Sequence, residues 1–223
     1  MNDTIKKYDV IVIGAGASGL NIYSFLHQVG VRALLIEKDE KNIGGDCLHA
    51  GCIPSKSLIH LANIGFKGNL RDAIREKQAS IESHENIDYF KSIGWDICIG
   101  EACFVGSNSL QVNDTVYHAK KIVVATGSRP RTIEIEGTQS FSIHTNETIF
   151  TLETPPAHFV VLGGGPIGVE IAEAYRKLGS TVSIITTDDS LLPRERKEVS
   201  MYLEDAFRAK GITIHKNTFI ARS

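Results

Sequence analysis

Tyr8-Asp9-Val10-Ile11-Val12-Ile13-Gly14-Ala15-Gly16-Ala17-Ser18-Gly19 is the stretch that decides the fold. Its apolar half predicts a buried strand over residues 8–13, and its glycines predict a tight turn before a helix over residues 20–29. A second strand is expected over residues 33–36, ending at Glu37. In such a βαβ unit the first glycine permits the turn, the second lets a pyrophosphate approach the helix N-terminus, and the third allows close helix–strand packing. Glu37 is placed to bind ribose hydroxyls, so the stretch predicts a dinucleotide site.

The same pattern occurs a second time and predicts a second dinucleotide site. A strand over residues 159–162 leads into Gly163-Gly164-Gly165-Pro166-Ile167-Gly168, and a helix to Leu178 and a strand over residues 182–185 follow. Thr186 stands where Glu37 stands in the first copy. An acid at this position would bind a ribose 2′-hydroxyl and repel a 2′-phosphate, so NADPH is not excluded as a ligand.

The loop after Thr186 offers two alternatives for recognition of the ribose. Arg194 and Arg196 could meet a 2′-phosphate, although two arginines in a polar loop are more often merely solvated. Asp188 and Asp189 could instead serve the ribose from a shifted position. The sequence therefore leaves NADH and NADPH open.

The two copies predict an α/β fold with two Rossmann-like βαβ units. Between them we expect a helix from about Pro54, a polar amphipathic stretch over residues 70–90, and short alternating strands over residues 96–119. Asn113-Asp114 predicts a hairpin turn between two of these strands, which would form a small antiparallel meander. A buried parallel strand is expected over residues 121–124, before Ala125-Thr126-Gly127.

Composition excludes several classes of protein. Among 223 residues, 24 are Lys or Arg and 26 are Asp or Glu, which gives a formal net charge of −2 and no basic excess for nucleic acid. Four cysteines are too few for a disulfide scaffold. The apolar run over residues 10–13 is far too short for a membrane span or a secretory core. We therefore expect a cytoplasmic protein without a membrane segment in this chain.

Gly44-Gly45-Asp46-Cys47-Leu48-His49-Ala50-Gly51-Cys52-Ile53-Pro54-Ser55-Lys56 sets two cysteines five residues apart. On a regular helix five residues advance about 7.5 Å and turn roughly 140°, whereas a disulfide needs a Cα separation of about 4.4 to 6.8 Å. The backbone between the cysteines must therefore be irregular. Pro54 suits the first turn of a following helix, whose free N–H groups would favour a thiolate at Cys52. The segment predicts a redox-active disulfide.

Two other interpretations of this segment remain open at this stage. One is a purely structural disulfide, which is disfavoured because a protein without a secretory signal normally keeps its cysteines reduced. The other is a metal site built from Cys47, His49 and Cys52. Metal sites usually use two separated ligand pairs, and the sequence has no convincing second pair.

The segment over residues 44–56 resembles the Gly-Gly-x-Cys-x4-Cys-x-Pro-Ser-Lys signature of the class I flavoprotein (pyridine nucleotide) disulfide oxidoreductases. This family includes dihydrolipoamide dehydrogenase, glutathione reductase and mercuric reductase, and the resemblance extends from Asp9 to about Glu195. Residues 84–90 and 145–148 are more similar to the mercuric reductase and dihydrolipoamide dehydrogenase branches. The resemblance implies FAD and NAD(P)H as cofactors and a homodimeric parent protein. It also implies hydride transfer from NAD(P)H to FAD, and electron transfer to Cys47–Cys52 and on to a small disulfide or a metal ion.

The resemblance also assigns four catalytic residues. Cys52 would face the flavin as a charge-transfer thiolate, and Cys47 would exchange with the substrate. Lys56 and Glu170 would pair beside the flavin ring, although Glu170 could also be an ordinary helix residue that faces water. No resident metal is implied. The expected cofactor-binding residues are Gly14, Gly16, Ala17, Ser18, Gly19, Glu37, Lys38, Gly45, Asp46, Cys47, Cys52, Lys56, Ala102, Ala125, Thr126, Gly127, Gly163, Gly165, Pro166, Ile167, Gly168 and Thr186.

The domain organisation follows from the resemblance and from Thr154-Pro155-Pro156, which interrupts regular structure. We expect an FAD-binding domain over residues 1–150 and an NAD(P)-binding domain over residues 151–223. Cys98 and Cys103 share the five-residue spacing but lack the flanking motif, and they are predicted to be buried small hydrophobic residues.

The family's chains are longer than this one, and its acid–base histidine has no counterpart among the histidines here. We therefore expect a fragment that binds FAD weakly or not at all and completes no catalytic cycle. Two alternatives to a disulfide reductase remain. One is a two-dinucleotide flavoprotein that reduces another acceptor, and the other is a nucleotide-binding module without turnover.

Overall fold

The computed structural model describes residues 5–131, 135 and 142–219 of the chain. The chain divides into two compact units, one of residues 1–53 and 78–129 and the other of residues 54–77 and 130–223. These contact-based units differ from the predicted domains, because residues 54–77 group with the C-terminal half of the chain. The predicted domain limits rest on the family resemblance and on Thr154-Pro155-Pro156, and they stay a prediction. The predicted domains also contain residues 1–4, 132–134, 136–141 and 220–223, which lie outside the described residues.

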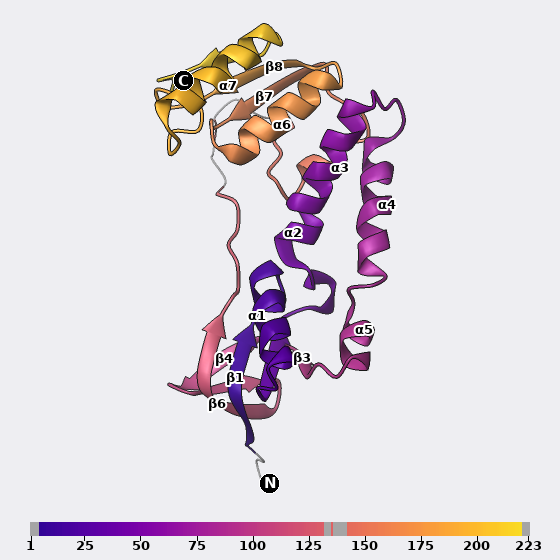
Figure 1. Cartoon of the computed structure of the whole chain (residues 1–223), viewed down its shortest axis with the longest axis vertical. Helices are drawn as coiled ribbons and strands as arrows, with labels where there is room; N and C mark the ends of the chain where they lie inside the picture. The colour runs from indigo at the N-terminus through magenta and orange to yellow at the C-terminus, as the bar shows by residue number, and fades with distance from the viewer. Residues whose placement is uncertain (1–4, 132–134, 136–141, 220–223) are drawn as a thin grey trace. The chain divides into compact units, whose positions relative to one another are not determined.

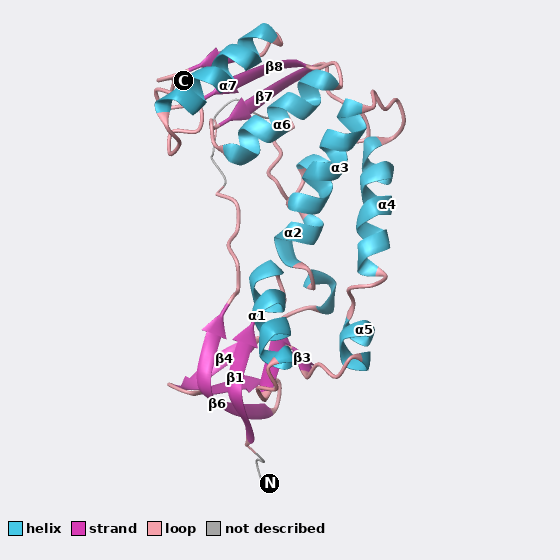
Figure 2. Cartoon of the chain, in the orientation of Figure 1, coloured by secondary structure: helices cyan, strands magenta, loops and turns pink. Residues whose placement is uncertain are grey.

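The first unit contains a six-stranded sheet in the order β3-β2-β1-β6-β5-β4 (Figures 1 and 2). Four strands are parallel to one another, and β4 and β5 extend the sheet as an antiparallel meander. This confirms the predicted α/β fold with its small meander. The strands are β1 Lys6–Ile13, β2 Ala33–Glu37, β3 Ile97–Ile99, β4 Ala102–Gly106, β5 Ser109–Val112 and β6 Thr115–Val124.

Strand β6 corrects the sequence-based prediction. The last strand of the meander and the strand expected over residues 121–124 are one continuous strand, which pairs with β5 over Thr115–His118 and with β1 over Tyr117–Val124. It is also less buried than predicted, since Val124 is 62% exposed. A strand is buried only where both of its faces are covered. Within the described residues, the end of β6 does not have such cover.

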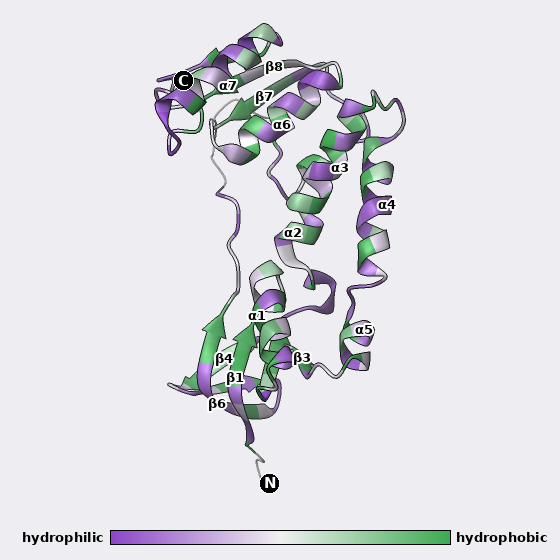
Figure 3. Ribbon diagram, in the orientation of Figure 1, coloured by the Kyte–Doolittle hydropathy of each residue, from purple (hydrophilic) through white to green (hydrophobic). Residues whose placement is uncertain are grey.

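Two apolar layers cover the parallel part of this sheet. On one face, Val12 and Leu35 pack in a cluster with Tyr23, Phe90 and Trp95 from α1 Ala17–Gln28, α5 Ile87–Ser92 and the segment after it. The other face packs against the meander, and its cluster contains Tyr8, Ile11, Leu34, Leu110 and Tyr117. Neighbouring residues of β1 and β2 are thus buried on opposite faces, as expected for inner parallel strands. Figure 3 shows the arrowhead end of β1 in the green of hydrophobic residues.

The stretch over residues 70–90 forms two helices rather than one. Helix α4 runs over Leu70–Glu82, and α5 begins after Asn86, whose side-chain Oδ1 accepts a hydrogen bond of 3.0 Å from the Tyr89 amide. An asparagine at this cap position stabilises a new helix start. The cysteine segment likewise forms two helices, α2 Gly45–His49 and α3 Cys52–Asn63, and a 3-10 turn, η1 Glu40–Asn42, precedes them.

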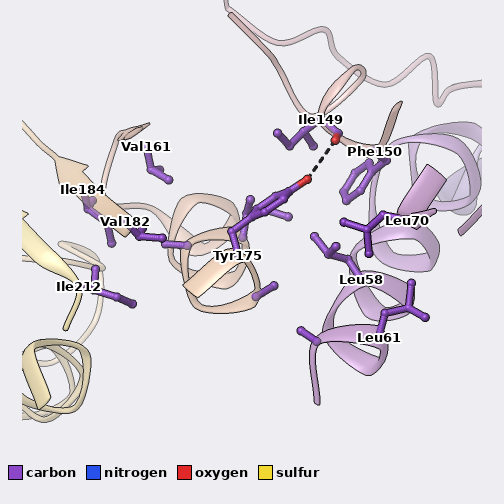
Figure 4. Packing of buried hydrophobic residues seen from close by; sticks show 14 of the residues in the cluster. Leu58, Leu61, Leu70, Ile149, Phe150, Val161, Tyr175, Val182, Ile184 and Ile212 are labelled. Carbon is purple, nitrogen blue, oxygen red and sulfur yellow. Dashed lines mark hydrogen bonds between the residues drawn. The ribbon is translucent and has the colours of Figure 1, made fainter. Parts of the chain in front are cut away.

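The second unit contains a parallel sheet in the order β7-β8-β9. Its strands are β7 His158–Leu162, β8 Thr181–Ile185 and β9 Thr213–His215, and its helices include α6 Pro166–Lys177 and α7 Lys197–Ala209. The second βαβ prediction is therefore confirmed. Figure 4 shows Leu58 and Leu61 of α3 in the core of this unit, where Tyr175 of α6 donates a hydrogen bond of 3.3 Å to the Ile149 carbonyl in the turn η3 Ile149–Thr151.

Cys98 and Cys103 lie in β3 and β4, at opposite ends of the strand order. Cys98 is half-buried, and its Sγ lies 3.5 Å from the Tyr117 hydroxyl oxygen. Cys103 is exposed, so the prediction that it is buried was wrong. Strand β4 forms the edge of the sheet and nearly all of its residues are exposed, which the alternating sequence did not indicate.

Candidate functional site

The first glycine turn joins β1 to α1, and two of its glycines are required by packing within the protein itself. Gly14 has φ +103°, and a Cβ there would lie 2.3 Å from the Ala125 carbonyl oxygen. At Gly19, a Cβ would lie 1.8 Å from the Gly14 carbonyl oxygen. Gly16 is the N-cap of α1 and supplies no side-chain cap. The helix start, with Ala17 and Ser18 in its first turn, therefore offers backbone N–H groups and a partial positive charge to an anion.

The structure brings the glycine pair of the cysteine segment against this turn. The Gly44 amide donates a hydrogen bond of 2.9 Å to the Ala15 carbonyl, and a Cβ at Gly45 would lie 2.7 Å from the Gly16 Cα. Such a close backbone approach tolerates no side chain at Gly45. Ala125 joins the group, because its amide donates a hydrogen bond of 2.8 Å to the Ile13 carbonyl. Thr126 and Gly127 follow directly in the chain.

Glu37 lies at the end of β2 and is only 8% exposed. Its Oε2 accepts a hydrogen bond of 2.6 Å from the Ala15 amide, and its Oε1 accepts one of 2.8 Å from the Lys38 amide. The carboxylate is thus fixed against the glycine turn, and Oε1 also accepts a long hydrogen bond of 3.5 Å from the Asp39 amide. Oε2 keeps an acceptor position for a ribose hydroxyl. Ala102 starts β4, two residues after Gly100, whose amide donates to the Glu37 carbonyl at 2.8 Å.

Cys47 lies in α2 and Cys52 begins α3, and the backbone between them is irregular, as predicted. Ala50 ends α2 with φ −139°, and a Cβ at Gly51 would lie 2.8 Å from the Asp46 carbonyl oxygen. The two cysteines are not joined in a disulfide, and their side chains are in hydrogen-bonding contact with each other. Burial, followed by this contact with Cys52, raises the pKa of the Cys47 thiol. The break between the helices therefore places two thiols together.

A buried glutamine beside this break was missed by the sequence analysis. Gln78 of α4 donates hydrogen bonds from Nε2 to the Leu48 carbonyl at 2.9 Å and to the His49 carbonyl at 3.0 Å. The signal was present, because Gln78 continues the helical spacing of Leu70 and Ile74 and so puts an amide in an apolar position.

His49 takes part in structural contacts rather than in a cluster of metal ligands. Its Nε2 lies 2.9 Å from the Ile43 carbonyl oxygen, and its Nδ1 lies 3.6 Å from Glu82 Oε1. Among the described residues, no group of three His, Cys, Asp or Glu side chains could hold a metal ion. The alternative of a metal site at Cys47, His49 and Cys52 is therefore not supported.

Lys56 of α3 and Glu170 of α6 form an ion pair within the second unit, although 114 residues separate them in the sequence. The Glu170 side chain is half-buried and the Lys56 side chain is more exposed. The structure thus brings these two predicted residues together.

The second glycine turn joins β7 to α6. Gly163 has φ +110°, and a Cβ at Gly168 would lie 2.5 Å from the Gly163 carbonyl oxygen. Gly165 is the N-cap of α6 without a side-chain cap, and a Cβ there would have nothing within 4 Å. Pro166 and Ile167 open the helix. Because this helix start is open and lacks a cap, it also fits an anionic ligand.

The residues after β8 are arranged around Thr186, which is buried. Its hydroxyl donates a hydrogen bond of 3.2 Å to Asp188 Oδ2. The loop is tied to the glycine turn, because the Leu192 amide donates to the Gly164 carbonyl at 2.8 Å. Arg194 is exposed, and Arg196 Nε lies 3.6 Å from Glu198 Oε2 in an exposed pair.

The sequence profile described as pyridine nucleotide-disulphide oxidoreductase matches residues 8–223. The chain belongs to this family. A dihydrolipoyl dehydrogenase of Mycoplasma genitalium is 33% identical and matches 97% of this chain and 52% of its own length. A mercuric reductase of Lysinibacillus sphaericus is 29% identical and matches 97% of this chain and 42% of its own length. The chain therefore spans about half the length of the curated relatives it matches.

Solved structures of the family agree with this membership. The Cu(II) complex of the HOCl-induced flavoprotein disulfide reductase RclA from Escherichia coli superimposes with a TM-score of 0.82 at 29% identity, over 98% of this chain and 51% of that one. No helix among the described residues is long and apolar enough to cross a membrane.

Proposed function

We propose that this chain provides the FAD site, the redox-active cysteine pair and part of the nicotinamide nucleotide site of an FAD-dependent NAD(P)H:disulfide oxidoreductase. The observation that carries the proposal is the break between α2 and α3. It apposes the thiols of Cys47 and Cys52, and the glycine pair before it packs on the first dinucleotide turn. A redox pair attached to a dinucleotide turn is the arrangement that this chemistry requires.

The residues present fit the two cofactors. The uncapped start of α1, the glycine cradle and the fixed Glu37 carboxylate would hold the pyrophosphate and ribose of FAD. The uncapped start of α6 would hold the pyrophosphate of NAD(P)H. When bound, FAD supplies two-electron chemistry between a nicotinamide hydride donor and a disulfide. Lys56 and Glu170, which form an ion pair, are the residues that the family resemblance assigns to the flavin ring.

The cysteines themselves carry out the exchange with a substrate. In the reduced pair, the Cys47 thiolate attacks a substrate disulfide, forms a mixed disulfide and releases one substrate thiol. The Cys52 thiolate then attacks Cys47, so that the second substrate thiol leaves and the Cys47–Cys52 disulfide forms. One substrate disulfide gains two electrons and two protons, and the cysteine pair loses them. A small disulfide and a metal ion are the proposed acceptors, as the names of the two enzyme relatives suggest.

An absorption spectrum of the purified chain with added FAD tests this function. If the chain takes up FAD, the protein fraction will show flavin bands and, after anaerobic addition of two electron equivalents, a long-wavelength thiolate-to-flavin band. Cys52→Ser should abolish that band, whereas Cys103→Ser, at an exposed cysteine of the meander, should leave it unchanged. A chain that takes up FAD but gives no such band on reduction would contradict the proposed place of Cys52, whereas a chain that stays colourless would agree with the expected weak or absent binding of FAD.

A further inference from the structure

The break between α2 and α3 leaves backbone carbonyls at the end of a very short helix. In a regular helix the last four carbonyl groups lack intrahelical partners, and a helix of five residues has few others. Here the Ala50 amide bonds to the Asp46 carbonyl at 2.8 Å. The next carbonyls, those of Leu48 and His49, accept their hydrogen bonds from the side chain of Gln78.

Gln78 is a polar residue at a buried helix position that an apolar residue would normally occupy. It is 7% exposed, and both of its side-chain hydrogen bonds reach backbone carbonyls of the cysteine segment across 29 and 30 positions of sequence. Burying an amide is unfavourable unless it is hydrogen-bonded, so these bonds are needed for Gln78 to be tolerated there. In return, they fix the end of α2.

The alternative to this break is a continuous helix through the cysteine segment. Such a helix would satisfy the Leu48 and His49 carbonyls internally and would separate Cys47 from Cys52 by about 7.5 Å and roughly 140°. Side-chain donors that bind these carbonyls therefore stabilise the broken form, in which the two thiols are in contact. The broken form is also the only one compatible with disulfide geometry.

We propose that Gln78 is the positioning residue of the Cys47–Cys52 pair. By holding the Leu48 and His49 carbonyls, it keeps the helix break in place and favours the disulfide over the dithiol. The inference rests on the proposed redox function of this pair. In the reaction considered, the two thiols lose two electrons and two protons to oxidised dithiothreitol, which becomes reduced dithiothreitol as the Cys47–Cys52 bond forms.

The test compares thiol–disulfide equilibria of the whole chain in dithiothreitol redox buffers. Samples are quenched with an alkylating reagent, and the oxidation state of the peptide with Cys47 and Cys52 is read by mass spectrometry. Gln78→Leu removes both donors at similar volume, and we expect it to shift the equilibrium constant about tenfold towards the dithiol, because two buried hydrogen bonds are lost. Gln111→Leu is the matched control, since Gln111 is exposed and donates to the Asn113 carbonyl at 3.1 Å, outside the cysteine segment.

The outcomes separate this inference from the proposed function. A wild-type chain that forms no Cys47–Cys52 disulfide at any buffer ratio overturns the proposed function. If the wild-type chain forms the disulfide but Gln78→Leu has the same equilibrium constant as Gln111→Leu, only the role of Gln78 is overturned. Should Gln78→Leu fail to fold by circular dichroism, Gln78→Glu gives the same comparison, because it keeps a polar group of similar size and turns the donor into an acceptor.

Discussion

The two glycine turns have nearly the same sequence pattern but different surroundings. Around the first turn, a Cβ at Gly14, Gly19 or Gly45 would collide with backbone atoms of the protein. Around the second, a Cβ at Gly168 would likewise lie 2.5 Å from the Gly163 carbonyl oxygen, but a Cβ at Gly163 or Gly165 would have nothing within 4 Å. The same motif thus serves two purposes. In the first turn, glycine lets three backbone segments meet, whereas at Gly165 glycine leaves room at the open start of a helix.

The residues at the ribose position of the two turns, Glu37 and Thr186, also differ in their surroundings. Glu37 is buried and receives two short backbone hydrogen bonds, whereas Thr186 contacts an exposed Asp188. We expect the first turn to respond to substitution through stability as well as through ligand binding. Substitution at Gly165 of the second turn should act mainly through binding.

The largest expected effect is on stability in the first turn. Gly19→Ala places a methyl group against the Gly14 carbonyl and should destabilise the protein by about 2–3 kcal/mol, which outweighs the better helix propensity of alanine. Gly165→Ala meets open space and should cost less than about 1 kcal/mol. Urea unfolding of both variants measures the difference, and equal shifts of the midpoint would remove the distinction between the turns.

A smaller effect is expected at the two ribose positions. In Glu37→Gln the new side-chain N–H₂ must face the amide of Ala15 or Lys38, so one backbone donor loses its acceptor at a cost of about 1–3 kcal/mol. Thr186→Val removes two hydrogen bonds with the exposed Asp188, one donated to its carboxylate and one accepted from its amide. Because water can replace both, the loss should be about 0.5–1.5 kcal/mol. Unfolding curves recorded side by side test this order, and a larger loss for Thr186→Val would reverse it.

Nucleotide selectivity at the second turn is expected to change several-fold. The Asp188 carboxylate accepts a hydrogen bond from the Thr186 hydroxyl. At this position it could also accept a hydrogen bond from a ribose hydroxyl and would repel a 2′-phosphate. Asp188→Ala should therefore raise the ratio of NADPH to NADH affinity about five- to tenfold, which calorimetric titration of both nucleotides would measure. Arg194→Ala is the companion variant, and a loss of NADPH binding there would assign the ribose site to Arg194 instead.

The smallest effect concerns the reactivity of the cysteine attached to the first turn. Burial and the neighbouring Cys52 thiol raise the pKa of Cys47, so its thiolate fraction near neutral pH is lower than that of an ordinary thiol. Alkylation of Cys47 should accelerate at a higher pH than alkylation of a free thiol such as glutathione. Cys52→Ser should move this pH profile part of the way back, because burial remains. A profile in Cys52→Ser identical to that of the wild-type chain would assign the shift to burial alone.

Much of the fold could be predicted because its signals are local. The apolar runs before Gly14 and Gly163 predicted the strands, and the glycine spacing predicted the turns, although α1 begins at Ala17, three residues before the expected start at residue 20. The prediction failed at the strand that pairs antiparallel with one neighbour and parallel with another. Strand β6 was divided in two, because its first half alternates like a meander strand and its second half has a mostly apolar end like a parallel strand. The pattern of polar and apolar residues within a short segment does not show whether two adjacent segments form one continuous strand.

The sequence by itself determined that there are two βαβ units and that the backbone between Cys47 and Cys52 is irregular, since both follow from residue spacing and from the geometry of a single helix. Only the tertiary structure decided which distant groups meet. Gln78 reaches the carbonyls at the break and Gly45 packs on Gly16, whereas the Lys56–Glu170 pair was expected from the family resemblance and not from spacing. Each of these contacts joins segments that are far apart in the chain. Their partners are fixed by the packing of whole helices and strands, which spacing within one segment does not specify.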